Sequence, residues 1–181
     1  MLNAAFFLIK SFSDLYLATF LLRFILQRVR GDFYNPLSQF VVRATNPLVV
    51  PARRILPSAG GYDLPTLTVL AVLECLVTWL LLKLVGTTVN LETFVLFVLL
   101  RLISLTLWLY SISLLVYVIL SWVAQASYSP IAMLLGQVVG PILRPVRRVL
   151  PPIGGFDLSP LVVLLLIQAL MIALPLPTYL R

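Results

Sequence analysis

Four long apolar segments constrain this chain more than any other feature of its sequence. They run over residues 2–27, 64–85, 94–123 and 158–179. Each is long enough for a helix of roughly 20 residues, which spans the hydrocarbon core of a bilayer. Charged residues make up only 10% of the chain, whereas a soluble domain carries about a quarter. The pattern predicts an all-α membrane protein with four transmembrane helices.

The arginines between these segments predict how the chain is oriented. Both long loops are basic, with Arg28, Arg30, Arg43, Arg53 and Arg54 in the first and Arg144, Arg147 and Arg148 in the second. The connector GTTVNLET between the second and third segments has one acid and no base. Because loops rich in Lys and Arg stay in the cytoplasm, we expect both long loops there. Both termini are then periplasmic, in a bacterial inner membrane.

The chain is also an internal duplication. After a shift of 94 residues, Asn46–Leu76 and Gly140–Leu170 match at 14 of 31 positions without a gap. The shared core reads PARRILPSAGGYDL in the first copy and PVRRVLPPIGGFDL in the second. Two spans in each copy give both copies the same orientation, so the sequence predicts parallel repeats.

This duplication sets the expected organisation. The first repeat covers residues 1–86, a connector covers 87–94, and the second repeat covers 95–181. Within the repeats we expect transmembrane helices over 2–27, 64–85, 95–123 and 158–179. The cytoplasmic segments between them are expected to be amphipathic and interfacial over 36–57 and 130–151.

Apolar residues at helical spacing support these interfacial segments. The stripe is Leu37, Phe40, Val41, Ala44 and Leu48 in the first copy, and Ile131, Leu134, Leu135, Val138 and Ile142 in the second. Such a helix is suited to lie at the membrane surface, although a shallow re-entrant segment is the alternative. Pro47 and Pro141 are expected to break or kink it. A second short turn, starting at Pro51 or Pro145, would then carry the arginine pair.

The repeated motif supplies ten candidate site positions. They are Arg53, Arg54, Gly60, Gly61, Asp63, Arg147, Arg148, Gly154, Gly155 and Asp157. The arginine pairs are expected to contact lipid headgroups, with docking of an acidic partner as the alternative. The glycines permit a tight reversal, and the aspartates are expected to cap the following helix. Two isolated arginine pairs are too small a basic surface for nucleic acid.

The predicted spans of the first repeat contain Lys10, Asp14, Arg23, Glu74 and Lys83, of which Lys10, Asp14 and Glu74 are the candidates for intramembrane chemistry. The second repeat has Ser104, Trp108 and Gln168 at these positions. Charges in a bilayer are costly and face the protein interior in pairs. They form either a structural ion pair between the first two spans or a route for protons or cations. The third span, which carries Arg101, either tilts in the bilayer or begins in the headgroup zone with Arg101 snorkelling to the headgroups.

The composition argues against catalysis. The chain has no histidine, which is the commonest general base and metal ligand. Its one cysteine, Cys75, lies in the apolar run VLECLVTW and is interpreted as inert. No nucleophile–base pair, metal cluster or phosphate loop accompanies the motif. We therefore expect no enzyme and no catalytic, cofactor-binding or metal-binding residues.

The duplicated core resembles the paired YggT repeat of small bacterial inner-membrane proteins, also called the YlmG family. The resemblance rests on NPLVVPARRILPSAGGYDL and GPILRPVRRVLPPIGGFDL. It implies a connection with osmotic-stress tolerance and ion balance. Gram-positive relatives lie near cell-division genes, and plastid relatives are linked to haem attachment on a cytochrome and to nucleoid distribution. Without histidine, this chain is not expected to hold haem itself.

These observations predict a non-enzymatic scaffold or assembly protein of the inner membrane. Its partners would be anionic lipid headgroups and other membrane proteins or further copies of itself. The alternative is a small ion-transport or channel component that uses Lys10, Asp14 and Glu74.

Overall fold

The computed structural model describes residues 2–58, 61–122, 129–150 and 157–180. These residues form six α-helices and hold no strand. The helices are α1 Leu2–Arg28, α2 Pro36–Ile55, α3 Leu64–Val85, α4 Leu91–Trp122, α5 Pro130–Val149 and α6 Ser159–Ala173. By length and composition, α1, α3 and α4 are able to cross a membrane. The prediction of an all-α membrane protein is confirmed at this level.

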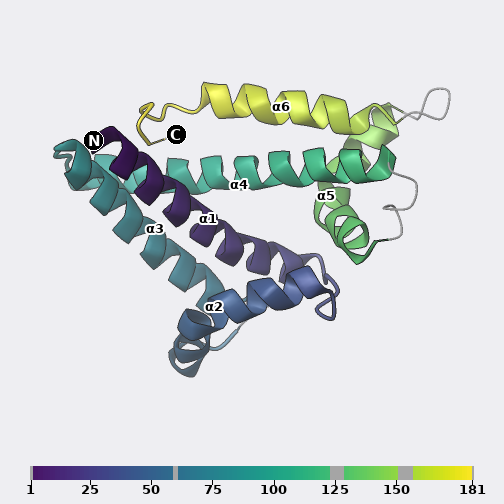
Figure 1. Ribbon diagram of the computed structural model, residues 1–181, viewed down its shortest axis with the longest axis horizontal. Helices are drawn as coiled ribbons and strands as arrows, with labels where there is room; N and C mark the ends of the chain where they lie inside the picture. The colour runs from purple at the N-terminus through teal and green to yellow at the C-terminus, as the bar shows by residue number, and fades with distance from the viewer. Residues whose placement is uncertain (1, 59–60, 123–128, 151–156, 181) are drawn as a thin grey trace.

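The helices form two units of similar plan. In the first, α1 packs against α3 and α2 contacts both; in the second, α4 packs against α6 and α5 contacts both. The units meet where α4 contacts α1 and α3, and where α2 contacts α5. Figure 1 shows both chain termini and the α3–α4 connection at one end, whereas α2 and α5 lie away from it.

The two amphipathic helices begin and end 94 residues apart, as the sequence alignment does. Each starts with a proline in its first turn, behind an extended N-cap residue. The Asn35 side chain accepts a hydrogen bond from the Leu37 N–H at 2.9 Å. The Ser129 hydroxyl accepts one from the Ala132 N–H at 3.1 Å. Such caps satisfy N–H groups that the first helical turn leaves free.

The helices do not break at the internal prolines, so the expectation of a break and of a separate second turn is wrong. Pro47 and Pro51 lie inside α2, and Pro141 and Pro145 lie inside α5. A proline removes one backbone hydrogen bond and crowds the preceding turn. Tertiary packing compensates, because each helix buries a face along its length. In α2 this face runs from Ser38 through Val41 and Thr45 to Val49.

The last predicted span is also shorter than expected. The segment 158–179 is helical only from Ser159 to Ala173, which is about 22 Å at 1.5 Å per residue. Leu174 precedes Pro175 and is extended, with φ −63° and ψ 127°, as the clash with a following proline favours. Beyond it, Leu176 and Leu180 are buried against α3 and α4.

Two apolar clusters hold the units together. The larger centres on Phe20 and Leu17 of α1 and includes Leu109 of α4 and Leu134 of α5. A second cluster at the other end packs the C-terminal Leu180 against α3 and α4. Many large apolar side chains elsewhere are exposed, which suits lipid-facing surfaces.

The turn after α3 depends on a glycine. Gly86 is the C-cap residue with φ 73°, and its N–H donates to the carbonyls of Leu82 and Lys83. A Cβ there meets no atom of the described residues within 4 Å, so the cost of alanine is conformational. We expect Gly86→Ala to lower the free energy of unfolding by about 1 kcal/mol. Unfolding by SDS titration in mixed micelles measures the change.

Gly140→Ala is the matched control. Gly140 lies inside α5, and a Cβ there also meets nothing within 4 Å. Because its backbone is helical, alanine should stabilise the protein by about 0.5–1 kcal/mol. The same sign of change in both variants would contradict this account of Gly86.

Candidate functional site

Arg101 of α4 connects Lys10, Asp14 and Glu74 of the first repeat in one network of ion pairs. Its Nη2 donates to Asp14 Oδ1 at 2.6 Å, and its Nε donates to Glu74 Oε1 at 2.6 Å. Its Nη1 donates to the Leu180 carbonyl at 3.0 Å. Lys10 Nζ completes the network with a 2.8 Å bond to Asp14 Oδ2. The Arg101 side chain is only 4% exposed.

The network is electrically balanced, with two cations and two carboxylates. Thr78 adds a neutral donor to Glu74 Oε1 at 3.2 Å. The remaining oxygen, Glu74 Oε2, is buried and has no hydrogen-bond partner in the described part of the chain. The charges tie α1, α3, α4 and the C-terminal segment together. Lys10 and Glu74 share no direct bond among the described contacts; Asp14 and Arg101 lie between them.

The interpretation of Arg101 as a snorkelling residue is therefore wrong. Reaching the headgroups would leave Glu74, whose side chain is 1% exposed, without its counter-charge, which is strongly unfavourable. Comparison of the repeats gives no warning, since the counterpart of Arg101 in the first repeat is Phe7.

The second repeat builds a neutral contact at the equivalent position. Gln168, the counterpart of Glu74, donates from Nε2 to Ser111 Oγ at 3.0 Å. This bond joins α6 to α4, much as the charged network joins α3 to α4. The position thus links helices in both repeats, but only the first repeat does so with ions.

The repeated motif forms an ion pair in both copies. Arg53 Nη2 lies 2.8 Å from Asp63 Oδ2, and Arg147 Nη2 lies 2.7 Å from Asp157 Oδ2. Each arginine sits in the last turn of an amphipathic helix. Each aspartate lies just before the next helix, α3 or α6. We call each Arg–Asp pair a clamp, because it fastens the end of α2 or α5 to the start of the following helix.

The first clamp is the more buried. The Asp63 side chain is 1% exposed, whereas that of Asp157 is 28% exposed. Burial by itself raises the pKa of Asp63, but the Thr66 hydroxyl at 2.7 Å and the Arg53 guanidinium bring it below its usual value. For Asp157, burial likewise opposes hydrogen bonds from Ser159 and Arg147, and the pKa is again lowered.

Arg23 extends the first clamp into α1. Its Nη1 donates to Thr45 Oγ1 at 2.6 Å and to Asn46 Oδ1 at 2.9 Å. Its Nε lies 3.9 Å from Asp63 Oδ2. The second repeat has Tyr117 in place of Arg23. The position of Arg23 within the predicted first span marks it as a residue that needs a partner. The sequence does not identify these partners, because Thr45 and Asn46 of α2 lie 22 and 23 residues away.

The other motif positions divide into three groups. Arg54 and Arg148, the second arginine of each pair, are exposed and form no ion pair within the described residues. Gly61 has φ 78°, a conformation that favours glycine. Gly60, Gly154 and Gly155 lie outside the described residues. The motif thus presents one arginine inward, to the aspartate, and one outward.

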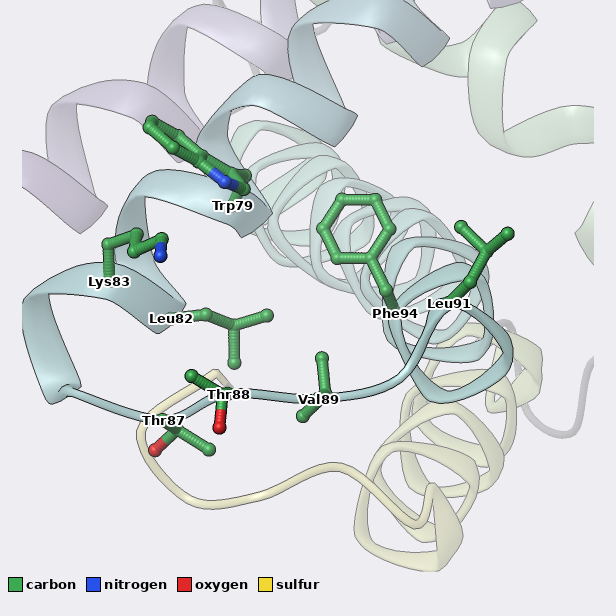
Figure 2. Close-up of a pocket in the computed structure, with 8 residues that line it drawn as sticks. All are labelled: Trp79, Leu82, Lys83, Thr87, Thr88, Val89, Leu91 and Phe94. Atoms are coloured by element: carbon green, nitrogen blue, oxygen red, sulfur yellow. The ribbon is translucent and has the colours of Figure 1, made fainter.

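A cavity of about 350 Å³ lies at the opposite end of the molecule, where α3 turns into α4. Figure 2 shows its lining, which is Trp79, Leu82, Lys83, Thr87, Thr88, Val89, Leu91 and Phe94. Lys83 is the one charged residue among the described residues that line it, and its Nζ lies 6.0 Å from the centre of the Trp79 ring. These side chains include no carboxylate or thiol, so they offer no pair for acid–base or nucleophilic chemistry.

The family model described as CCB3/YggT matches this chain twice, over residues 2–85 and 96–177. The chain belongs to the CCB3/YggT family. Each match covers one three-helix unit, from the first long helix through the clamp to the helix that follows. The resemblance of the duplicated motif to YggT repeats is confirmed.

Relatives match over most of their length. An "Uncharacterized protein PA0392" of Pseudomonas aeruginosa is 44% identical over 161 residues, which cover 88% of this chain and 82% of the relative. A protein of Vibrio alginolyticus, "Uncharacterized protein in proC 3'region", is 41% identical over 92% of this chain and 91% of its own. "Uncharacterized protein YggT" of Escherichia coli K12 is 39% identical over 93% and 88%. No solved structure matches the chain.

Proposed function

We propose that this family member is a non-enzymatic scaffold of the bacterial inner membrane. It holds two amphipathic helices, α2 and α5, at the cytoplasmic surface, where they organise lipid or partner proteins. The two units are parallel repeats with four membrane passes, and both termini are periplasmic. The role served is osmotic-stress tolerance or assembly of a membrane complex, as the resemblance to the YggT family implies.

The duplicated clamp is the observation that carries this proposal. Both copies fix the end of an amphipathic helix to a membrane helix through an arginine and an aspartate ten residues apart. Catalysis requires one set of reactive side chains, whereas a contact that positions a helix can be used in both repeats. The exposed Arg54 and Arg148 then face the same surface, where they can contact phosphates or an acidic protein.

Contacts between the repeats support a common surface. The Asn35 side chain, at the start of α2, donates to the Pro130 carbonyl at 2.6 Å. The Asp32 N–H donates to Gln137 Oε1 of α5 at 3.2 Å. The N-terminal end of α2 therefore contacts α5 directly, which favours both helices on one leaflet.

Cysteine accessibility tests this arrangement. In a Cys75→Ser background, Arg54→Cys and Arg148→Cys should each react with a membrane-impermeant maleimide in inside-out vesicles. Neither should react in right-side-out vesicles. A cysteine engineered at Thr88, in the α3–α4 connector, is the matched control and should give the reverse pattern. Labelling of positions 54 and 148 from opposite sides would refute parallel repeats and the scaffold together.

Ion transport is a second candidate function. The buried oxygen Glu74 Oε2, without a hydrogen-bond partner in the described residues, favours it. Unpaired acidic oxygens inside membranes are typical of proton or cation routes. The closed, balanced pairing of the other charges favours a structural role instead.

A charge-free network separates the two functions. The variant K10Q/D14N/E74Q/R101Q removes every ion of the network at once, so no buried charge is left alone. If the protein is a scaffold, this variant should restore survival of osmotic downshock in a deletion strain as well as the native chain. R54Q/R148Q should fail at equal expression. Failure of the charge-free variant and success of R54Q/R148Q would favour transport.

A further inference from the structure

A cavity of about 700 Å³ lies between α1, α4 and α5. Apolar side chains near the C-terminal end of α1 form one wall, among them Leu21, Phe24 and Ile25. Two arginines, Arg28 of α1 and Arg144 of α5, also line it. The cavity belongs to neither the charge network nor the clamps. Its volume lies within the range of about 300–1,000 Å³ that ligand sites occupy.

The lining changes from basic to apolar along α1. Arg28 and Leu21 are seven residues apart on this helix, which corresponds to about 10 Å. Thr106 and Tyr110 of α4 continue the lining. Along α1, a molecule that fills the cavity therefore meets positive charge at one end and hydrocarbon at the other. A free inorganic anion would use only the basic end.

The two arginines are available to a ligand. Both are exposed, and neither forms an ion pair with any residue that the structure describes. Arg28 lies 5.4 Å over the Tyr62 ring, a contact that leaves the edges of the guanidinium group free. Among the described residues, no acidic side chain lines the cavity. Two guanidinium groups suit a phosphate, which they bind through paired N–H donors.

Two glycines of α5 form part of the cavity wall. Gly136 and Gly140 both line it. A Cβ on Gly136 would lie 3.4 Å from the Tyr117 ring, whereas one on Gly140 would meet nothing within 4 Å. The first repeat has Asn46 at the counterpart of Gly140, and this side chain binds Arg23. At this position the first repeat has a side chain in a polar contact, Asn46, and the second repeat has no side chain, because the residue is Gly140.

We propose that this cavity binds one anionic phospholipid. Its phosphate lies between Arg28 and Arg144, and the upper part of an acyl chain lies along the α1 wall and past Gly140. The basic end matches the charge of the headgroup, and the apolar wall selects a lipid over a soluble anion. This site does not depend on the scaffold function, because it requires neither the clamps nor the outward arginines.

Native mass spectrometry of the full purified chain tests the proposal, with phosphatidylglycerol and phosphatidylcholine as probes. We expect the native chain to prefer phosphatidylglycerol by about tenfold or more, because both lipids carry a phosphate but the choline cation of phosphatidylcholine is repelled by two arginines. R28Q/R144Q should lose this preference. The matched control R54Q/R148Q makes the same change in charge on arginines outside the cavity and should keep it. Thermal unfolding of each variant establishes that it is folded.

A steric variant tests the apolar part separately. Gly140→Leu places a side chain in the cavity without changing the charge, and it should reduce retention of phosphatidylglycerol by about tenfold as well. Equal losses in R28Q/R144Q and R54Q/R148Q would overturn the site in favour of general surface attraction. Displacement of phosphatidylglycerol by millimolar inorganic phosphate, or full retention by Gly140→Leu, would overturn the lipid as occupant.

Discussion

Replacing Arg101 by glutamine will destabilise the protein by about 3–5 kcal/mol, the usual cost of removing one member of a buried ion pair. Arg101 is 4% exposed and donates to both Asp14 and Glu74 at 2.6 Å. Without it, Glu74 keeps only the Thr78 hydroxyl as a described donor. Its charge would remain in an interior that solvates it poorly. SDS titration in mixed micelles measures the loss.

Two controls make this prediction specific. Arg54→Gln removes an exposed arginine and should change the free energy of unfolding by less than about 0.5 kcal/mol. The variant K10Q/D14N/E74Q/R101Q removes the whole network and should recover most of the stability that R101Q loses, because no charge is left without a partner. If R101Q unfolds like R54Q, Arg101 does not hold the buried position described above.

The periodic and repeated features of this fold were predictable from the sequence. Apolar length predicted the long helices, because a bilayer leaves backbone groups no partner outside a helix. The shift of 94 residues predicted that α2 and α5 begin and end at equivalent positions. Helix propensity alone gave the wrong prediction where tertiary packing determines whether a helix continues. Pro47 and Pro141 lie inside continuous helices, since the faces buried on neighbouring helices outweigh one lost hydrogen bond each.

The candidate sites were predictable only in part, because their bonds connect distant residues. Lys10 and Asp14 are four residues apart, so helical spacing brought them together. Arg101 reaches Asp14 across 87 residues, and local spacing gives no information on such a contact. The clamps are a different case. Opposite charges duplicated at the same separation of ten residues are a signal of pairing, although the aspartates were interpreted as helix caps alone.

The two clamps should differ in strength, and Asp63→Asn and Asp157→Asn measure the difference. Asn keeps the size of the side chain and removes its charge. At Asp63, 1% exposed, the change also deprives the buried Arg23 of a carboxylate 3.9 Å away. We expect a loss of about 2–3 kcal/mol there. In the second clamp the Asp157 side chain is 28% exposed and the Arg147 side chain is 38% exposed. Water therefore screens the pair, and the loss of unfolding free energy in Asp157→Asn should stay below about 1 kcal/mol.

The dependence of stability on acidic pH distinguishes the loss of an ion pair from a change in side-chain packing. The pKa of each aspartate is lowered in the folded protein, so the folded state binds fewer protons than the unfolded chain. The contribution of each clamp is therefore complete above the ordinary carboxyl pKa of about 4 and disappears as the pH falls through the lower folded-state value. Asp63→Asn should remove more of this acid dependence than Asp157→Asn. Equal losses at neutral pH, or an unchanged acid profile in Asp63→Asn, would mean that burial does not set the strength of the clamp.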